Sequence, residues 1–416
     1  MKETLKTVIK EQNKQRDTSG KIERSIPLEL VNCDEILVIS GIRRCGKSVL
    51  LQQIRKKQKE QDFFINFDDE RLVNFSINDF QLLHEVFVEM YGSQQIFYFD
   101  EIQNIPGWER FVRRLYDARN KIFITGSNAT MLSRELGTHL TGRYVRFELY
   151  PFSFREFLRF KKFNLPNDNI FTTDENGKIS AYFNDFLENG GIPIYVKQKN
   201  EQYLKQLYES ILYKDVMIRN RLTNEREILQ LMYFIASNIA KPATYQSLAS
   251  VIGVKNTTTV KNYLSYIENT YMLFQVSKFD FSLKAQYINP KKNYFIDNAL
   301  VQKLGFNFSK NTGRLLENTV FIELKRRGKE IFYHQNNFEC DFVIRNGFSI
   351  SEAIQVCHTF ENEITKQREI NGLLEALNTH NLDKGLILTS SSEETIQIEN
   401  KTINIIPVWK WMLLNC

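Results

Sequence analysis

The sequence is poor in cysteine and has no long apolar run. Its five cysteines are scattered through 416 residues and form no CxxC pair. That spacing argues against a disulfide framework or a zinc site and indicates a reducing compartment. No window approaches the ~20 apolar residues of a membrane span, and the N-terminus lacks the apolar core of a signal peptide. We therefore expect a cytoplasmic protein without a membrane segment.

A large excess of one charge is also missing, because 55 basic and 49 acidic residues leave a net charge of +6. The hydrophobic fraction of 42%, with 32 Phe and 18 Tyr, argues against a disordered, coiled-coil or collagen-like chain. Charge is concentrated only locally. Between Lys241 and Lys292 there are seven lysines and two acids, so 7 − 2 = +5. A polyanion would be sought in this stretch.

The clearest motif is the octapeptide GIRRCGKS, which follows the apolar run Ile36–Ile39 and precedes a helical pattern from Val49. It fits GxxxxGK[ST], in which a glycine loop aims backbone N–H groups at phosphate, the lysine adds a charge and the serine ligates Mg²⁺. At most one of the two arginines can face the phosphates. The motif predicts ATP binding by Gly41, Arg43, Arg44, Cys45, Gly46, Lys47, Ser48 and Val49.

A second motif is the apolar run Ile96–Phe99, which ends in Asp100 and Glu101. A parallel sheet delivers such carboxylates to its C-terminal edge, where phosphate loops also lie. We predict that Asp100 holds Mg²⁺ together with Ser48, and that Glu101 orients and deprotonates the attacking water. The alternative is an acidic turn after a buried strand.

A later apolar run, Ile122–Thr125, is followed by Gly126, Ser127 and Asn128. A polar side chain here can lie between the two acids and the γ-phosphate. Asn128 or Ser127 is therefore a candidate catalytic sensor. The alternative is a helix cap for the segment that starts at Ala129.

The first part of the chain alternates apolar strands with helical segments, which predicts an α/β domain with a parallel sheet. Past Pro151 a helical region follows. From Glu225 to about Ala299 three short helices and two strands appear in winged-helix order, and a separate α/β unit with several strands follows from about Gly313. The predicted domains are 1–200, 201–311 and 312–416.

The chain resembles the uncharacterised bacterial and archaeal ATP-binding proteins of the AAA-type superfamily whose C-terminal half is a domain of unknown function. The resemblance covers nearly the whole chain. It implies ATP binding, hydrolysis, a winged helix and a nuclease-like fold, and it implies that Arg143 reaches a nucleotide in its own chain or across a homo-oligomer contact. The alternative for Arg143 is a surface salt bridge. The motifs that carry the resemblance are GIRRCGKS, FYFDEIQNIPGWERFVRRLYD, IFITGSNATMLS, LTGRYVRFELYPFSFREF, GGIPIYV, YFIDNAL and GRLLENTVFIELKRR.

The predicted helix Thr257–Asn269 suits a recognition helix. At its start, Lys255, Asn256 and Lys261 can contact the phosphates or bases of double-stranded DNA, and Lys291 and Lys292 near the wing can neutralise its backbone. Winged helices also serve as protein-contact modules, so DNA binding and protein binding both remain open.

The C-terminal unit resembles restriction-endonuclease-like folds, whose sites need acids for Mg²⁺ and a lysine near the scissile phosphate. Glu317 and Asp341 lie at suitable positions, but Gln355-Val356-Cys357 stands where the pattern wants Glu-x-Lys. Lys325 or Lys366 would have to substitute. We therefore predict a retained scaffold without nuclease activity.

The sequence thus predicts an Mg-ATP-dependent ATPase whose hydrolysis drives a conformational switch in the winged-helix half. Two alternatives remain: a nucleotide-gated DNA-binding protein with little hydrolysis, and an ATP-dependent nuclease.

Overall fold

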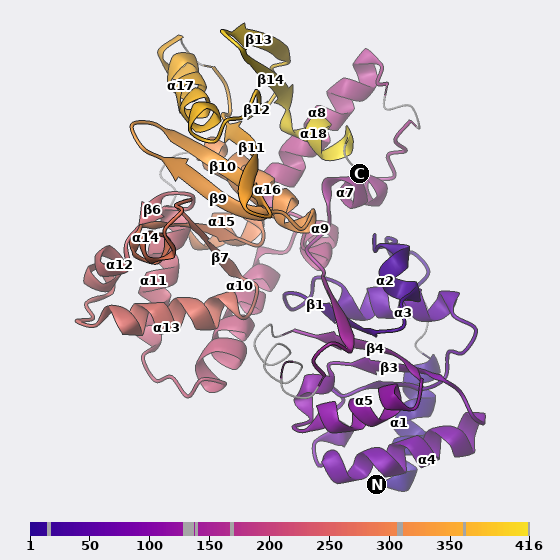
Figure 1. The fold of residues 1–416 in the computed structure, drawn as a ribbon. Helices are drawn as coiled ribbons and strands as arrows, with labels where there is room; N and C mark the ends of the chain where they lie inside the picture. The colour runs from indigo at the N-terminus through magenta and orange to yellow at the C-terminus, as the bar shows by residue number, and fades with distance from the viewer. Residues whose placement is uncertain are drawn as a thin grey trace. The chain divides into compact units, whose positions relative to one another are not determined.

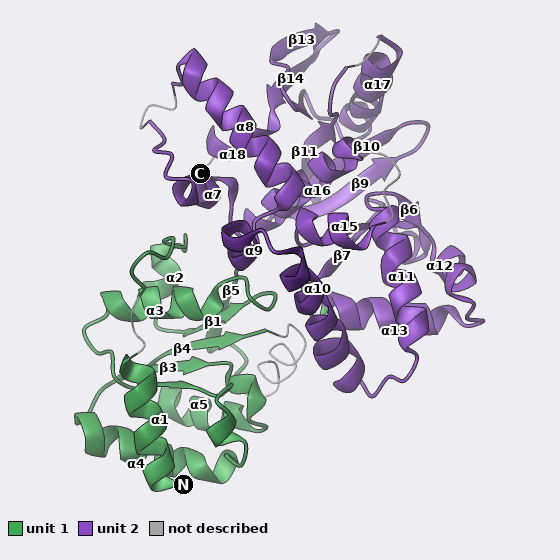
Figure 2. Cartoon of the chain, turned by 180° about the vertical axis from the view of Figure 1, so that it is seen from behind, with its two compact units in different colours: residues 1–149, 269–271 green, residues 150–268, 272–416 purple. Residues whose placement is uncertain are grey.

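The computed structural model describes residues 1–14, 18–127, 137, 140–166, 170–305, 311–360 and 363–414 (Figure 1). The chain folds into two compact units, which Figure 2 draws in green and purple. Unit 1 comprises residues 1–149 and 269–271, and unit 2 comprises residues 150–268 and 272–416. Within the described ranges, no helix is long and apolar enough to cross a membrane.

Unit 1 is built on a five-stranded parallel sheet with the order β2-β3-β4-β1-β5. Its central strands are apolar on both faces and are buried, as expected for a parallel sheet covered by helices. The predicted parallel sheet is therefore confirmed. The strands are β1 (Ile36–Ser40), β2 (Phe64–Asn66), β3 (Ile96–Asp100), β4 (Lys121–Gly126) and β5 (Tyr144–Glu148).

Helices cover both faces of this sheet. One face carries Ile36, Val38, Phe97 and Phe99, which join a large aromatic core with α1, α4 and α5. On the other face lies α3, whose Arg55 stacks over the rings of Phe64 and Tyr98. The helices are α1 (Lys2–Lys14), α2 (Leu28–Asn32), α3 (Lys47–Lys57), α4 (Phe80–Tyr91) and α5 (Trp108–Asp117), with short 3₁₀ turns at Glu70–Leu72, Ile77–Asp79 and Ile102–Asn104.

Unit 2 begins with a run of helices from residue 150. The predicted boundary at residue 200 divides this run between the ATPase domain and the winged-helix domain. A three-stranded antiparallel sheet of order β6-β8-β7 follows among further helices. The helices are α7 (Phe154–Phe160), α8 (Thr173–Asn189), α9 (Pro193–Gln198), α10 (Glu201–Ser210), the π-helix Ile211–Ile218, α11 (Glu225–Ser237), α12 (Tyr245–Ile252), α13 (Thr257–Glu268), α14 (Leu283–Ile288) and α15 (Asn298–Leu304); the strands are β6 (Pro242–Ala243), β7 (Leu273–Ser277) and β8 (Lys291–Phe295).

The C-terminal part of unit 2 is a six-stranded mixed sheet of order β13-β14-β12-β11-β10-β9. The hairpin strand β13 is absent from the sequence prediction, because this edge strand is mostly exposed and carries little apolar signal. The elements are α16 (Thr312–Arg326), β9 (Glu330–Gln335), β10 (Glu339–Asn346), β11 (Ser349–Val356), α17 (Glu363–Thr379), β12 (Lys384–Thr389), β13 (Glu394–Ile398), β14 (Lys401–Pro407) and α18 (Val408–Leu414).

Two helices contact opposite faces of this sheet. On one face α17 packs against Val343 of β10, and on the other Phe321 of α16 meets Phe342. The residues of α16 from Leu315 to Leu324 are all buried, polar ones included. The predicted α/β class, with a parallel sheet, a helical region and a further sheet domain, is confirmed.

Candidate functional site

The phosphate-loop motif forms the turn between β1 and α3, and its backbone requires two glycines. A Cβ at Gly41 would lie 2.2 Å from the carbonyl oxygen of Leu149. Gly46 has a φ of 106° and directly precedes Lys47, the first residue of α3. Such a positive φ strains any residue with a side chain. The sequence thus fixes the loop at a helix N-terminus, where backbone N–H groups favour an anion.

Lys47 lies inside this loop and is 4% exposed. Its Nζ donates hydrogen bonds to the carbonyl oxygens of Gly41 and Ile42, at 3.2 and 3.1 Å. The same atom lies 3.7 Å from Oε1 of Glu101. The ammonium is therefore held by neutral carbonyls and one more distant carboxylate, and phosphate oxygens are stronger partners than carbonyls for such a group.

Asp100 ends β3 beside the loop and is 2% exposed. Its carboxylate accepts hydrogen bonds from the hydroxyls of Thr125 and Ser48. Burial and the charge of Glu101 nevertheless raise the pKa of Asp100 to about 6. A hydroxyl and a carboxylate are hard oxygen donors that suit Mg²⁺, so Ser48 and Asp100 fit the predicted metal position.

Glu101 has a φ of 52°, an uncommon conformation for a residue with a side chain. Its backbone N–H donates to Oγ1 of Thr125 at 3.0 Å, and Gln103 donates to its carboxylate. Burial alone would raise the pKa of Glu101, but the charge of Lys47 and the hydrogen bond from Gln103 outweigh it and lower the pKa. The carboxylate is thus ionised and directed by its neighbours, as a base that orients water must be.

The other predicted loop residues have different surroundings. Arg43 is half-buried, and its charge contributes to lowering the pKa of Glu101. Arg44 is exposed and has a φ of 65°, whereas Cys45 is buried. Val49 lines a pocket of about 170 Å³ next to Ser48 and Asp100. The arginine nearer the acids is therefore Arg43.

The strand end after β4 reaches the same site. Ser127 is buried, and its hydrogen bond to Glu101 contributes to the lowered pKa of that carboxylate. Asn128, the other candidate sensor, lies outside the described residues. Ser127 is therefore the member of the predicted pair whose contact with the acids can be described.

Arg143 lies near the amino-terminal ends of the strands, whereas the phosphate loop lies at their carboxyl ends. It immediately precedes β5, and its carbonyl oxygen accepts the N–H of Ile36 at the start of β1. The loop begins after Ser40, at the other end of β1, about 15 Å along the strand at ~3.3 Å per residue. Arg143 instead pairs with Asp117 at 3.3 Å. Within unit 1, its side chain does not reach the loop.

Two residues that sequence reasoning did not assign belong to the site. Thr125 hydrogen-bonds both Asp100 and the backbone of Glu101. Arg24 is buried, and its guanidinium donates to the carbonyl oxygen of Cys45. The polar residue at the end of a buried strand was a signal for Thr125. Arg24 lies in a segment without helix or strand, so no periodic pattern marks it.

Comparison with known proteins assigns the chain to a family. A family model described as an AAA domain matches residues 34–158, and a domain of unknown function matches residues 180–311. An uncharacterised protein of Methanocaldococcus jannaschii is 37% identical over 94% of this chain and 91% of its own length. Another, from Haemophilus influenzae, is 30% identical over 93% of this chain and 96% of its own length. The chain belongs to this family of AAA-domain proteins.

Solved structures match the AAA-family chain at lower similarity. A Thermotoga maritima RuvB has 13% identity and a TM-score of 0.30, covering 58% of this chain and 82% of that one. AMPPCP-bound DnaA from Aquifex aeolicus has 18% identity and a TM-score of 0.24, covering 58% and 85%.

The lysines assigned to DNA in this AAA-family protein divide into two groups. Lys255 and Lys261, near the start of α13, are exposed. Lys291 is half-buried, and its Nζ donates to Oγ of Ser277. Lys292 is 0% exposed, so the prediction that it neutralises a DNA backbone is wrong. The reason is that Lys292 is directed into the protein, toward acids of α16 and β10.

The residues of the predicted nuclease-like site also have clear positions. Glu317 and Asp341 converge on Lys292. The two lysines considered as substitutes do not take part, since Lys366 pairs with Glu394 at 2.7 Å and Lys325 lies over the ring of Phe274. The lysine of this cluster is Lys292 of β8, a strand of the preceding sheet. Sequence reasoning did not assign Lys292 to this site.

Proposed function

We propose that this AAA-family protein binds Mg-ATP at the phosphate loop and hydrolyses it. One observation carries the proposal: Lys47, Ser48, Asp100 and Glu101 meet at the carboxyl ends of β1 and β3, and Thr125 is bonded to the carboxylate of Asp100 and to the backbone N–H of Glu101. These groups are the parts that phosphoryl transfer to water requires.

Each residue has a distinct role in this proposal. The loop backbone and Lys47 bind the β- and γ-phosphates. Ser48 and Asp100 would hold Mg²⁺, which when bound neutralises charge on the phosphate oxygens. Glu101 accepts a proton from the attacking water, and Thr125 holds the carboxylate of Asp100 and the backbone of Glu101 in place. Arg24 supports the loop from outside by bonding the carbonyl of Cys45.

Glu101→Gln tests the catalytic part of the proposal. The amide keeps the size of the side chain but is a poor base, so ATP turnover should fall about 100-fold or more, while nucleotide affinity stays within about threefold. Turnover is measured by phosphate release and affinity by titration with a fluorescent ATP analogue. Glu85→Gln, an exposed acid on α4, is the matched control and should leave both unchanged. Unchanged turnover in Glu101→Gln would remove Glu101 from the mechanism.

The proposal extends to the rest of the chain, where nucleotide state would switch the arrangement of the helical and C-terminal half. For Arg143 we propose only a contact across subunits. Within its own chain, Arg143 lies near the amino-terminal ends of the strands and the phosphate loop lies at their carboxyl ends. Arg143 would then contact a nucleotide bound by a neighbouring copy in a homo-oligomer. Mixing Arg143→Ala and Lys47→Ala chains tests this, since turnover should be partly restored only when the two variants assemble together.

A second candidate function is nucleotide-gated binding of double-stranded DNA. It is favoured by the exposed Lys255, Asn256 and Lys261 near the start of α13, in a region whose element order is that of a winged helix. An electrophoretic shift with and without ATP, repeated across a salt series, separates it from a plain ATPase. Lys255→Ala with Lys261→Ala should weaken the shift and flatten its salt dependence.

A further inference from the structure

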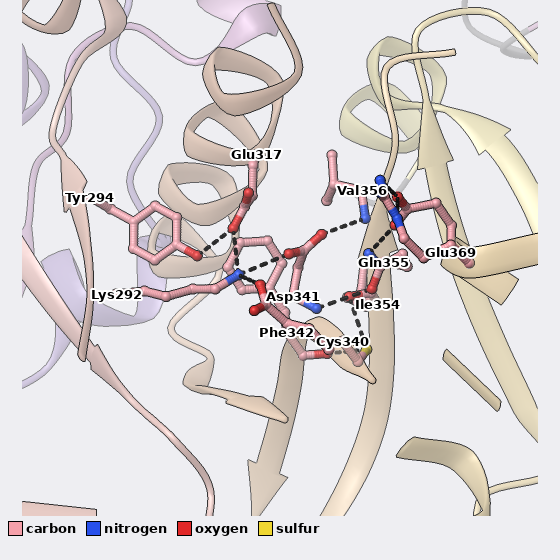
Figure 3. Close-up of polar contacts among 12 residues, drawn as sticks. Lys292, Tyr294, Glu317, Cys340, Asp341, Phe342, Ile354, Gln355, Val356 and Glu369 are labelled. Atoms are coloured by element: carbon pink, nitrogen blue, oxygen red, sulfur yellow. Dashed lines mark hydrogen bonds and ion pairs between the residues drawn. The ribbon is translucent and has the colours of Figure 1, made fainter. Parts of the chain in front are cut away.

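The acids of α16 and β10 converge on a single buried ammonium group. Nζ of Lys292 lies 3.0 Å from Oε1 of Glu317, 2.9 Å from Oδ1 of Asp341 and 2.7 Å from Oε1 of Glu339. Figure 3 shows the lysine entering from one strand, with Glu317 on a helix and Asp341 on a different strand. A lysine ammonium has three N–H donors, so three carboxylates use all of them.

The strand β8 supplies two neighbouring members of this cluster. Lys292 and Tyr294 are two residues apart and therefore project from the same face of β8. The hydroxyl of Tyr294 donates to Oε1 of Glu317 at 2.6 Å. The ring of Tyr333 lies 5.7 Å from Nζ of Lys292. The ammonium is thus surrounded by carboxylates and aromatic rings, and the side chain of Lys292 is 1% exposed.

Gln355, which stands where the nuclease pattern wants an acid, positions Asp341. Its Oε1 accepts the backbone N–H of Asp341 at 3.1 Å, and its amide nitrogen donates to Glu369. Oδ2 of Asp341 accepts the N–H of Val356 at 3.0 Å. Both ends of the glutamine are therefore occupied by partners other than the cation, and the two oxygens of Asp341 are divided between Lys292 and the backbone of β11.

These residues do not fit a resident Mg²⁺. Mg²⁺ requires oxygen ligands at ~2.1 Å in near-octahedral geometry, whereas the point where the acids meet is occupied by a positive nitrogen. Among the described residues, no group of three or more His, Cys, Asp or Glu side chains is arranged to hold a metal ion. A nuclease lysine must also face the scissile phosphate, and Lys292 is enclosed.

We propose that Lys292 permanently replaces the divalent cation of a nuclease-like centre, so that the C-terminal sheet is a metal-independent scaffold. The ammonium also bonds β8, a strand of the three-stranded sheet, to α16 and β10. Residues on either side of the predicted boundary at 311 are therefore joined by buried ionic contacts. Separating them would leave charges buried without partners, which is strongly unfavourable.

The test compares Lys292→Ala with its neighbour Lys291→Ala, in nucleotide-free full-length protein. In EDTA, Lys292→Ala should lose on the order of 10 °C in Tm, because it leaves buried carboxylates unpaired, whereas Lys291→Ala should lose only a few degrees. Adding Mn²⁺ should restore part of the loss in Lys292→Ala, with metal binding detected by electron paramagnetic resonance. Asp341→Asn in the Lys292→Ala background should abolish that binding. Equal Tm values for the two lysine variants would overturn the proposal.

The wild-type protein supplies a second measurement that does not depend on whether Lys292→Ala folds. Wild type and Asp341→Asn should bind the same amount of Mn²⁺, and neither should cleave plasmid DNA with Mg²⁺ and ATP. A stoichiometric Mn²⁺ site in wild type that Asp341→Asn removes would contradict the proposal. Plasmid cleavage lost in Asp341→Asn would also contradict it, and would instead support the ATP-dependent nuclease.

Discussion

The two units each bring a buried lysine together with acids, but they do so with opposite consequences. Lys47 is held by two carbonyl oxygens and has its one carboxylate partner at 3.7 Å. Lys292 has three carboxylate oxygens within 3.0 Å. Carbonyls are weak partners that a phosphate can replace, whereas three carboxylates leave the ammonium no capacity for a ligand.

The residues around the two lysines also differ in exposure. Next to Lys47 the hydroxyl-bearing Ser48 is exposed and lines a pocket with Asp100. Around Lys292, Glu317 and Asp341 are buried, whereas the side chain of Glu339 is 35% exposed. Gln355 and the backbone of Val356 hold Asp341. The same residue types thus form an open site in one unit and a closed ionic cluster in the other. The distinction lies in which acceptors surround the ammonium and in whether a ligand can approach.

The largest expected effect comes from closing the open site sterically. Gly41→Ala would place a Cβ against the carbonyl oxygen of Leu149, so the loop backbone must shift away from its phosphate-binding geometry. We expect nucleotide affinity to fall about 100-fold or more. Gly177→Ala in α8, where a Cβ meets nothing within 4 Å, is the control and should leave affinity unchanged. Titration with a fluorescent nucleotide measures both, and normal affinity in Gly41→Ala would contradict the proposed loop geometry.

A smaller effect follows from the pKa of Asp100, which burial and the charge of Glu101 raise to about 6. Only the ionised carboxylate attracts Mg²⁺, so the Mg²⁺-dependent part of ATP affinity is present above pH 6 and is lost as the pH falls through it. Between pH 7.5 and pH 5 we expect a loss of about tenfold.

ATP itself also titrates in this range, and Asp100→Asn separates the two effects. The asparagine side chain cannot ionise, so the pH dependence of ATP affinity in this variant, measured by calorimetric titration, reports only the protonation of ATP. If wild type and Asp100→Asn show the same pH dependence, Asp100 is not the metal-binding carboxylate.

The smallest effect concerns the closed cluster. Burial and the nearby Asp341 raise the pKa of Glu317 to about 8, against about 4.5 in the unfolded chain. Between these values the folded protein keeps a proton on Glu317 that the unfolded chain releases. In that range Oε1 of the protonated Glu317 still accepts hydrogen bonds from Lys292 and Tyr294, and the ionic contacts of Lys292 are those with Asp341 and Glu339. The stability that Glu317 contributes is therefore present below pH 4.5 and is lost as the pH rises through 8.

Glu317→Gln removes this titration but can still accept hydrogen bonds from Lys292 and Tyr294. The Tm of wild type relative to the variant should fall by several degrees between pH 5 and pH 8.5, measured by thermal unfolding. Burial also raises the pKa of Asp297 to about 7. Because Asp297 is present in both proteins, its effect on Tm cancels in the difference between them. A difference in Tm that does not change with pH would show that Glu317 is ionised throughout.

Much of the open site could be predicted from local sequence. The order of strand, glycine loop and helix places Lys47 and Ser48, and the apolar strand before Asp100 and Glu101 places the acids at the same edge. The position of Arg143 could also be predicted. Strands of a parallel sheet run in the same direction, so a residue that precedes one strand lies at the other end of the sheet from residues that follow its neighbours. The distance of Arg143 from the loop is therefore a consequence of sheet polarity that sequence reasoning overlooked.

The closed cluster could not be predicted in full. Glu317 and Asp341 were placed by the helix and strand patterns, but their partner lies 25 residues before the first and 49 before the second. Two adjacent lysines on a strand project from opposite faces, and no local pattern says which face is buried. Lys292 was therefore interpreted as an exposed contact for DNA. Arg24 escaped prediction because it lies in a segment without periodicity.

Calorimetric titration of nucleotide-free protein with ATP in magnesium buffer tests the central claim most directly. The account predicts saturable heat at one site per chain for the wild type and for Lys292→Ala where that variant is folded, and none for Lys47→Ala. A folded wild-type protein that gives no heat of binding, or a Lys47→Ala variant that binds as well as the wild type, would contradict it.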